Sequence, residues 1–67
     1  MDERRFTPEG GPYELIYFGE RVGEPTEWTV EAYHRDGAVE QAIFIGPDAR
    51  ERAVSYLRQQ YGFDAAT

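Results

Sequence analysis

The sequence predicts an α+β domain in which a three-stranded antiparallel sheet carries one C-terminal helix on one face, in the order β-β-β-α. Three observations support this fold class: two alternating runs flank Asp36-Gly37, an aromatic-rich run precedes them, and apolar residues recur at helical spacing near the C-terminus. The chain has 67 residues and no cysteine. This length is near the lower limit for folding without disulfides, so we expect a single domain.

The domain is expected to span residues 12–63, between two tails. Residues 1–11 are polar and contain a proline and two adjacent glycines, so they are expected to form a flexible N-terminal tail. Phe6 is the apolar side chain of this tail that can fold back onto the domain. Residues 64–67 are expected to form a short C-terminal tail.

The first strand is expected at residues 13–18, with the sequence YELIYF, because aromatic and branched residues favour strands. A connector with two glycines and a proline follows at residues 19–26. We favour Ile16 and Phe18 as the residues that face the helix, although the alternation alone leaves the inward face open. The opposite face then carries Tyr13, Leu15 and Tyr17.

The second and third strands are expected at residues 27–35 and 38–45, joined by Asp36-Gly37 in a two-residue type I′ turn. Such a turn places Trp28 opposite Ile45. One face of this hairpin is then expected to pack against the helix through an apolar stripe made of Trp28, Val30, Val39, Ile43 and Ile45.

The chain is expected to become helical at Pro47, since proline suits the first helical position. Asp48 and Glu51 complement the positive end of the helix. Gly62 is placed to end the helix in a left-handed conformation, after which Phe63 folds back. The apolar helix face comprises Ala49, Ala53, Val54, Tyr56, Leu57 and Tyr61.

One helix covers only one face of this sheet, so the other face is predicted to be open. In the expected register it combines aromatic side chains with carboxylates, and the candidate partner-binding residues are Glu27, Glu31, Glu40, Tyr33, Tyr17 and Phe44. Exposed patches of this kind mark interaction sites, where tyrosine is enriched. Three occupants remain open: the tails or connector of this chain, a second copy, or a different protein.

The formal net charge is −6, and all seven basic residues are arginine. This charge argues against direct binding to nucleic acid or to a membrane surface, since both are anionic. Carboxylates on a rigid sheet can instead imitate phosphates and occupy a basic site on a partner protein. No apolar run approaches the roughly 20 residues of a membrane span, and the N-terminus lacks a signal-peptide pattern, so a cytoplasmic location is expected.

Catalytic, cofactor and metal signatures are not found in the sequence. His34 is the only histidine and Ser55 the only serine, and cysteine and lysine are absent, so a nucleophile–base pair is hard to assemble. The glutamates of the expected sheet spread along a face rather than converging on a cation. We therefore expect a protein that is not an enzyme and that uses no cofactor and no metal.

In size, acidity, lack of cysteine and sheet-plus-helix plan, the chain resembles small acidic phage-type inhibitor proteins, including anti-CRISPR proteins. This resemblance rests on the character of the whole chain and not on a motif. It implies an inhibitor or regulator that mimics DNA at a basic, nucleic-acid-binding site. Residues 44–62, FIGPDARERAVSYLRQQYG, also resemble the strand-to-helix junction of small proteins from GC-rich bacteria. The alternative expectation is a homodimeric structural protein whose open sheet face is the dimer interface.

Overall fold

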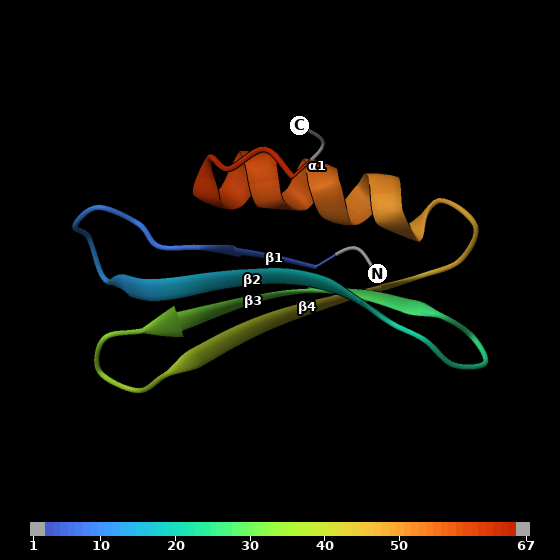
Figure 1. Cartoon of the computed structure of the whole chain (residues 1–67), viewed down its shortest axis with the longest axis horizontal. Coiled ribbons are helices and arrows are strands. Elements are labelled where there is room, and N and C mark those ends of the chain that lie inside the picture. Colours follow the sequence, from blue (N-terminus) through green and yellow to red (C-terminus); the bar gives the residue numbers. More distant parts are fainter. Residues whose placement is uncertain (1–2, 66–67) are drawn as a thin grey trace.

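The computed structural model describes residues 3–65 and shows a four-stranded antiparallel sheet with one C-terminal helix packed on one face (Figure 1). The elements are β1 (Glu3–Phe6), β2 (Tyr13–Arg21), β3 (Glu27–His34), β4 (Val39–Ile45) and α1 (Ala49–Tyr61). The strands lie side by side in chain order. The α+β class, the antiparallel sheet and the C-terminal helix are confirmed, but the sheet has four strands and not three. The outer ends of the two expected tails, residues 1–2 and 66–67, lie outside the described residues.

β1 is the strand that the sequence analysis missed, and it lies within the segment expected to be a flexible tail. It pairs antiparallel with β2, with Glu3 opposite Gly19 and Phe6 opposite Ile16. Phe6 packs against the core and stacks on Phe63, with the ring centroids 4.7 Å apart. The return of Phe6 to the domain, which the sequence allowed, is therefore observed, and Phe6 is part of a fourth strand.

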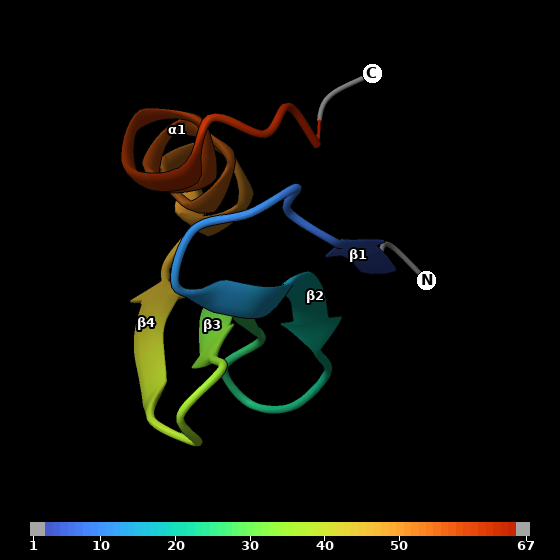
Figure 2. The ribbon, with the colours of Figure 1, turned by 90° about the vertical axis from the view of Figure 1, so that its left-hand side faces the viewer.

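The core lies between α1 and the helix-facing side of the sheet (Figure 2). Ile16 and Phe18 point inward, as favoured from the sequence, and meet Ala53 and Leu57 of α1 in the same cluster. Burying a large apolar side chain contributes roughly 1.5–3 kcal/mol before conformational entropy is subtracted. The buried apolar residues are Ile16, Phe18, Trp28, Val30, Ala32, Ala49, Ala53, Val54, Leu57 and Ala65.

The C-terminal end of α1 follows the prediction, whereas its N-terminal end lies two residues later than predicted. The helix begins at Ala49, with Asp48 at the N-cap position, so Pro47 lies just before it and not at its first position. Gly62 ends the helix with a left-handed φ of 80°, and its N–H donates to the carbonyl of Arg58 at 3.0 Å. Within residues 3–65, no helix has the length and hydropathy to cross a membrane.

The turn between β3 and β4 differs from the prediction. The His34 N–H donates to the Ala38 carbonyl at 2.8 Å, and the Gly37 N–H donates to the His34 carbonyl at 3.1 Å. Gly37 has a φ of 98°, whereas Asp36 does not have a positive φ. A type I′ turn requires positive φ at both central positions. The turn therefore spans three residues, 35–37, and ends in a left-handed glycine.

This extra turn residue moves the pairing of β4 by one position. Trp28 pairs with Phe44 and not with Ile45 as predicted. A shift of one residue places every side chain of a strand on the opposite face. Phe44 and Glu40 consequently lie on the helix side. The residues predicted for the core but found exposed on the other side are Val39, Ile43 and Ile45, with exposed fractions of 54%, 46% and 47%.

Candidate functional site

The candidate site is the sheet face that α1 leaves uncovered, which we call the open face. Strand alternation and the observed register assign side chains from all four strands to it. These residues are Glu3, Arg5, Leu15, Tyr17, Gly19, Arg21, Glu27, Thr29, Glu31, Tyr33, Val39, Gln41, Ile43 and Ile45.

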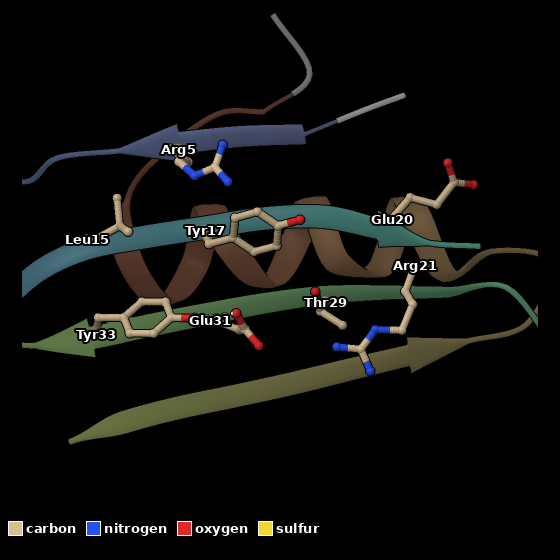
Figure 3. Close-up of a pocket in the computed structure, with 8 residues that line it drawn as sticks. All are labelled: Arg5, Leu15, Tyr17, Glu20, Arg21, Thr29, Glu31 and Tyr33. Atoms are coloured by element: carbon tan, nitrogen blue, oxygen red, sulfur yellow. Dashed lines mark hydrogen bonds between the residues drawn. The ribbon is translucent and has the colours of Figure 1, made fainter. Parts of the chain in front are cut away.

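A shallow hollow of about 470 Å³ lies on this face over β2 and β3 (Figure 3). Tyr17 and Tyr33 lie along its floor, and Arg5 reaches it from β1 (Figure 3). Small-molecule sites are enclosed and mostly apolar, with a few convergent polar groups. This hollow is broad and mixed in polarity, which suits contact with a protein surface better than enclosure of a ligand.

Tyr17 is fixed in place by a cluster at the β1 side of the open face. Its ring lies across Gly19, where an added Cβ would fall 2.6 Å from Tyr17 Cζ, so a larger residue at this position would displace the Tyr17 ring. The Tyr17 hydroxyl donates to Glu3 Oε2 at 2.9 Å, and Arg5 Nη1 donates to Glu3 Oε1 at 2.8 Å. The hydrogen bond from Tyr17, together with that from Arg5, lowers the pKa of Glu3. Burial and the Glu3 carboxylate in turn raise the pKa of Tyr17.

Glu31 holds a second cluster between β3 and β4. Its Oε1 accepts a hydrogen bond from the Tyr33 hydroxyl at 2.7 Å, and its Oε2 accepts one from Gln41 Nε2 at 2.6 Å. The bond to Glu31 and partial burial raise the pKa of Tyr33. Because both oxygens of Glu31 have donors, the carboxylate and the Tyr33 ring are held in one arrangement.

The open face is only weakly acidic. By strand alternation its carboxylates are Glu3, Glu27 and Glu31, and two of them face arginines on the same surface. Glu20 also lines the hollow. Arg5 lies 2.8 Å from Glu3, and Arg21 Nη1 lies 3.9 Å from Glu27 Oε1. The face therefore supplies less negative charge than the sequence analysis predicted.

Glu40 belongs to a different cluster, on the helix side at the end of the sheet. Its Oε2 lies 2.9 Å from His34 Nε2, and its Oε1 accepts a hydrogen bond from the Tyr61 hydroxyl at 2.9 Å. The Tyr13 ring packs on His34 at 4.8 Å and on Tyr61 at 5.2 Å between centroids. The contacts with His34 and Tyr61 lower the pKa of Glu40, and burial raises the pKa of Tyr61. The cluster thus ties the β3–β4 hairpin to the C-terminal end of α1.

The structure brings four of the six predicted partner-binding residues together on the open face: Tyr17, Glu27, Glu31 and Tyr33. It places the other two, Glu40 and Phe44, on the helix side, where the Phe44 ring packs on Tyr56 at 5.5 Å. Tyr13 was expected outside but turns to the helix side, because an irregularity between Tyr13 and Leu15 interrupts the alternation of β2.

The β1 residues and the three exposed aliphatic side chains of β4 belong to the open face but were not predicted from the sequence. The signal for β4 is the turn, since an Asp-Gly pair fits both a two-residue turn and a three-residue turn that ends in glycine. Asp36 Oδ1 accepts a hydrogen bond from the Ala38 N–H at 3.0 Å, which supports the longer turn. Within the described part of the chain, no group of three or more His, Cys, Asp or Glu side chains is placed to hold a metal ion.

Comparison of the chain with protein-family models, with curated proteins and with solved structures gives no match.

Proposed function

We propose that this chain is a non-enzymatic protein-binding module that docks its open face on another protein. The observation that carries the proposal is the exposure of three large aliphatic side chains on the sheet face that also carries Tyr17 and Tyr33. These side chains are Val39, which pairs with Tyr33, and Ile43 and Ile45. Contiguous apolar patches rimmed by polar groups mark interaction surfaces. Tyrosine adds contact area there at low conformational cost and keeps its hydroxyl hydrogen-bonded.

The partner that we propose presents an apolar site with a basic rim. The net charge of −6 attracts a basic surface over long range and increases the association rate. At contact, Glu27 and Glu31 would meet the basic rim. The open face itself carries little net negative charge, because Glu40 lies on the helix side and Arg5 lies on the open face. In this proposal, apolar contact therefore supplies the larger part of the affinity.

The finer form of the proposal is an inhibitor or regulator whose partner site normally takes nucleic acid, as the resemblance to anti-CRISPR proteins implies. The acidic charge of the chain supports this form, since a site built for phosphates is basic. Mimicry of a regular row of phosphates has weaker support, because the open-face carboxylates are hydrogen-bonded to side chains of their own surface.

The test compares two charge reversals of equal size. Glu31→Arg reverses a carboxylate on the open face, and Glu51→Arg makes the same change on the exposed side of α1. In titrations against a purified partner obtained by affinity capture, we expect Glu31→Arg to weaken binding about tenfold or more and Glu51→Arg to change it much less. Equal losses from both variants would contradict the open face as the contact surface.

A competition experiment addresses the nucleic-acid clause. A duplex oligonucleotide that binds the purified partner should be displaced by the wild-type chain and poorly displaced by Glu31→Arg. A ternary complex of partner, duplex and chain would contradict the inhibitor form and leave the docking surface unaffected.

The second candidate is a homodimeric structural protein joined through its open faces. The specific observation in its favour is that Arg5 and Arg21 of this face lie beside glutamates of the same chain. The surface that remains available for contact with a second copy is therefore mainly apolar. An apolar dimer of this kind should withstand salt, whereas an acidic–basic complex weakens steeply as salt increases. Light scattering at low and high salt, on the wild type and on the open-face variant Leu15→Ser, separates the two candidates.

A further inference from the structure

β4 is an edge strand whose outward backbone groups can be identified from the turn. Along an antiparallel ladder, hydrogen-bonded residue pairs alternate with pairs that are not hydrogen-bonded to each other. The bond from His34 N–H to Ala38 O identifies His34–Ala38 as a hydrogen-bonded pair, so every second pair from there along β3 and β4 is also bonded. The N–H and C=O groups of Val39, Gln41, Ile43 and Ile45 therefore point away from β3. The Ile45 carbonyl accepts a hydrogen bond from Arg52 Nη2, which agrees with this phase.

The two edges of the sheet differ in protection. β1 has four residues, two of which are arginines, and short charged strands are typical protected edges. β4 has seven residues, of which five are apolar and one, Glu40, is charged. It contains no proline, lysine or arginine, and it pairs with β3 without a shift in register. β4 stands at the outside of the sheet, with no further strand beside it in the described residues (Figure 2). A long, regular and apolar edge of this kind is a template for strand pairing.

We propose that β4 pairs antiparallel with β4 of a second copy, about a two-fold axis at Ala42, so that the two sheets become one. In this register Gln41 lies opposite Ile43 of the second copy, and Val39 lies opposite Ile45 of the second copy. The Gln41–Ile43 pairs exchange two backbone hydrogen bonds through the outward groups. In the Val39–Ile45 pairs, the Ile45 carbonyl uses its second lone pair, because it already accepts from Arg52 Nη2. The inference goes beyond the proposed function, because it uses the edge of the sheet and leaves both open faces free for a partner.

The position of α1 permits this pairing. The helix packs on both β3 and β4. Neighbouring strands are about 4.8 Å apart, so the helix axis lies about 5 Å from the proposed two-fold axis. The two helices would then lie about 10 Å apart, near the usual distance for packed helices. Ala42, on the helix side at the axis, has a side chain small enough to leave room for this contact.

Charges on the helix side favour a second copy as the occupant. Glu40 would lie opposite Phe44 of the second copy, and within one chain Arg52 sits over the Phe44 ring at 5.8 Å. Glu40 thus approaches Arg52 of the second copy, and the symmetry repeats the pair. The Glu40 and Arg52 side chains are 49% and 48% exposed, so each has surface left for this contact besides its bonds within the chain.

The first test measures mass by light scattering over about 1 µM to 1 mM for three chains. The wild type should approach twice 7.7 kDa. Gln41→Pro removes an outward N–H but no bond to β3 and should be monomeric, whereas the matched Gln41→Ala keeps the N–H and should dimerise. Leu15→Ser changes the open face on β2, away from the edge, and should also dimerise.

The second test uses charge exchange and does not depend on the proline variant folding. Glu40→Arg and Arg52→Glu should each weaken self-association about tenfold, since each places two like-charge pairs in the dimer. A mixture of the two variants restores both opposite-charge pairs between chains and should form heterodimers with near wild-type affinity. Circular dichroism confirms that each chain is folded.

Three results would overturn the inference. One is a wild type that stays monomeric over the whole range. Another is a dimer that Leu15→Ser abolishes and Gln41→Pro does not, which would place the interface on the open face. The third is a mixture of the charge variants that associates no better than either variant alone.

Discussion

The observed register of β4 predicts that truncating two neighbouring residues, Ile43 and Phe44, lowers stability by different amounts, in the reverse order of the register predicted from the sequence. Phe44 packs on the helix side against Tyr56, whereas Ile43 lies on the open face and is 46% exposed. We therefore expect Phe44→Ala to cost more stability than Ile43→Ala. The register predicted from a type I′ turn reverses this order, because it places Ile43 in the core and Phe44 outside.

The magnitudes follow from the burial of each side chain. A phenylalanine buries about 150–250 Å² when enclosed. Phe44 is partly buried, so at about 25 cal/mol per Å² its truncation should cost about 2–3 kcal/mol. Ile43→Ala removes three carbons worth about 0.8 kcal/mol each when buried, and about half of this when 46% exposed, or roughly 1 kcal/mol.

Urea denaturation monitored by circular dichroism measures both changes, with thermal unfolding as a second readout. A domain of this size has only about 3–10 kcal/mol of stability, so Phe44→Ala should lower the melting temperature by about 10 °C or more. If Phe44→Ala does not fold, the milder pair Phe44→Leu and Ile43→Val should show the same order. A larger loss for the Ile43 variants would refute the observed register.

Three further predictions concern single contacts. Gly37→Ala should lower the free energy of unfolding by about 1–2 kcal/mol in urea denaturation, because the φ of Gly37 is 98°. The control Gly23→Ala should not destabilise the domain, because Gly23 has space for a Cβ and no positive φ. Equal effects of the two substitutions would contradict the three-residue turn. Glu40 has a lowered pKa in the folded state, so its contribution to stability is present above its unfolded pKa near 4.5 and is lost as pH falls through the folded pKa. The free energy of unfolding of Glu40→Gln should therefore depend less on pH across this acid range than that of the wild type. An unchanged pH profile would contradict the cluster of Glu40 with His34 and Tyr61. The ultraviolet titration of Tyr17, obtained as the difference between the wild type and Tyr17→Phe, should have its midpoint above pH 10. In Glu3→Gln this midpoint should move to lower pH, since the Glu3 carboxylate helps to raise the pKa of Tyr17. An unchanged midpoint would show that the Tyr17 hydroxyl does not bond Glu3 in solution.

Much of the architecture was accessible from the sequence because local signals agreed with each other. The run of residues 13–18 predicted a strand. The inward position of Ile16 and Phe18, which was favoured although alternation alone left it open, is confirmed. Gly62 predicted the end of α1, where a left-handed residue is needed. These signals are local, and neither the turn nor the tails can change them.

The rest depended on contacts that a local pattern does not encode. The segment ERRF of β1 has one apolar residue, and its place in the sheet comes from pairing with β2 and from the stack of Phe6 on Phe63. The face of β4 depended on whether the turn at Asp36-Gly37 contains two residues or three. Both turns accept that dipeptide, so the choice required the backbone φ of Asp36.

The turn therefore decides what the open face offers to a partner. With two turn residues, β4 would have contributed Glu40 and Phe44 to it, and the acidic DNA-mimic hypothesis would have its row of carboxylates. With three, β4 contributes Val39, Ile43 and Ile45, and the carboxylates that remain on this face are bonded within their own surface or lie beside an arginine. The same shift directs Glu40 to the helix side of the edge, where Arg52 of a second copy would meet it. Affinity at the open face should consequently follow apolar area, whereas charge should act mainly on association rate and at the β4 edge.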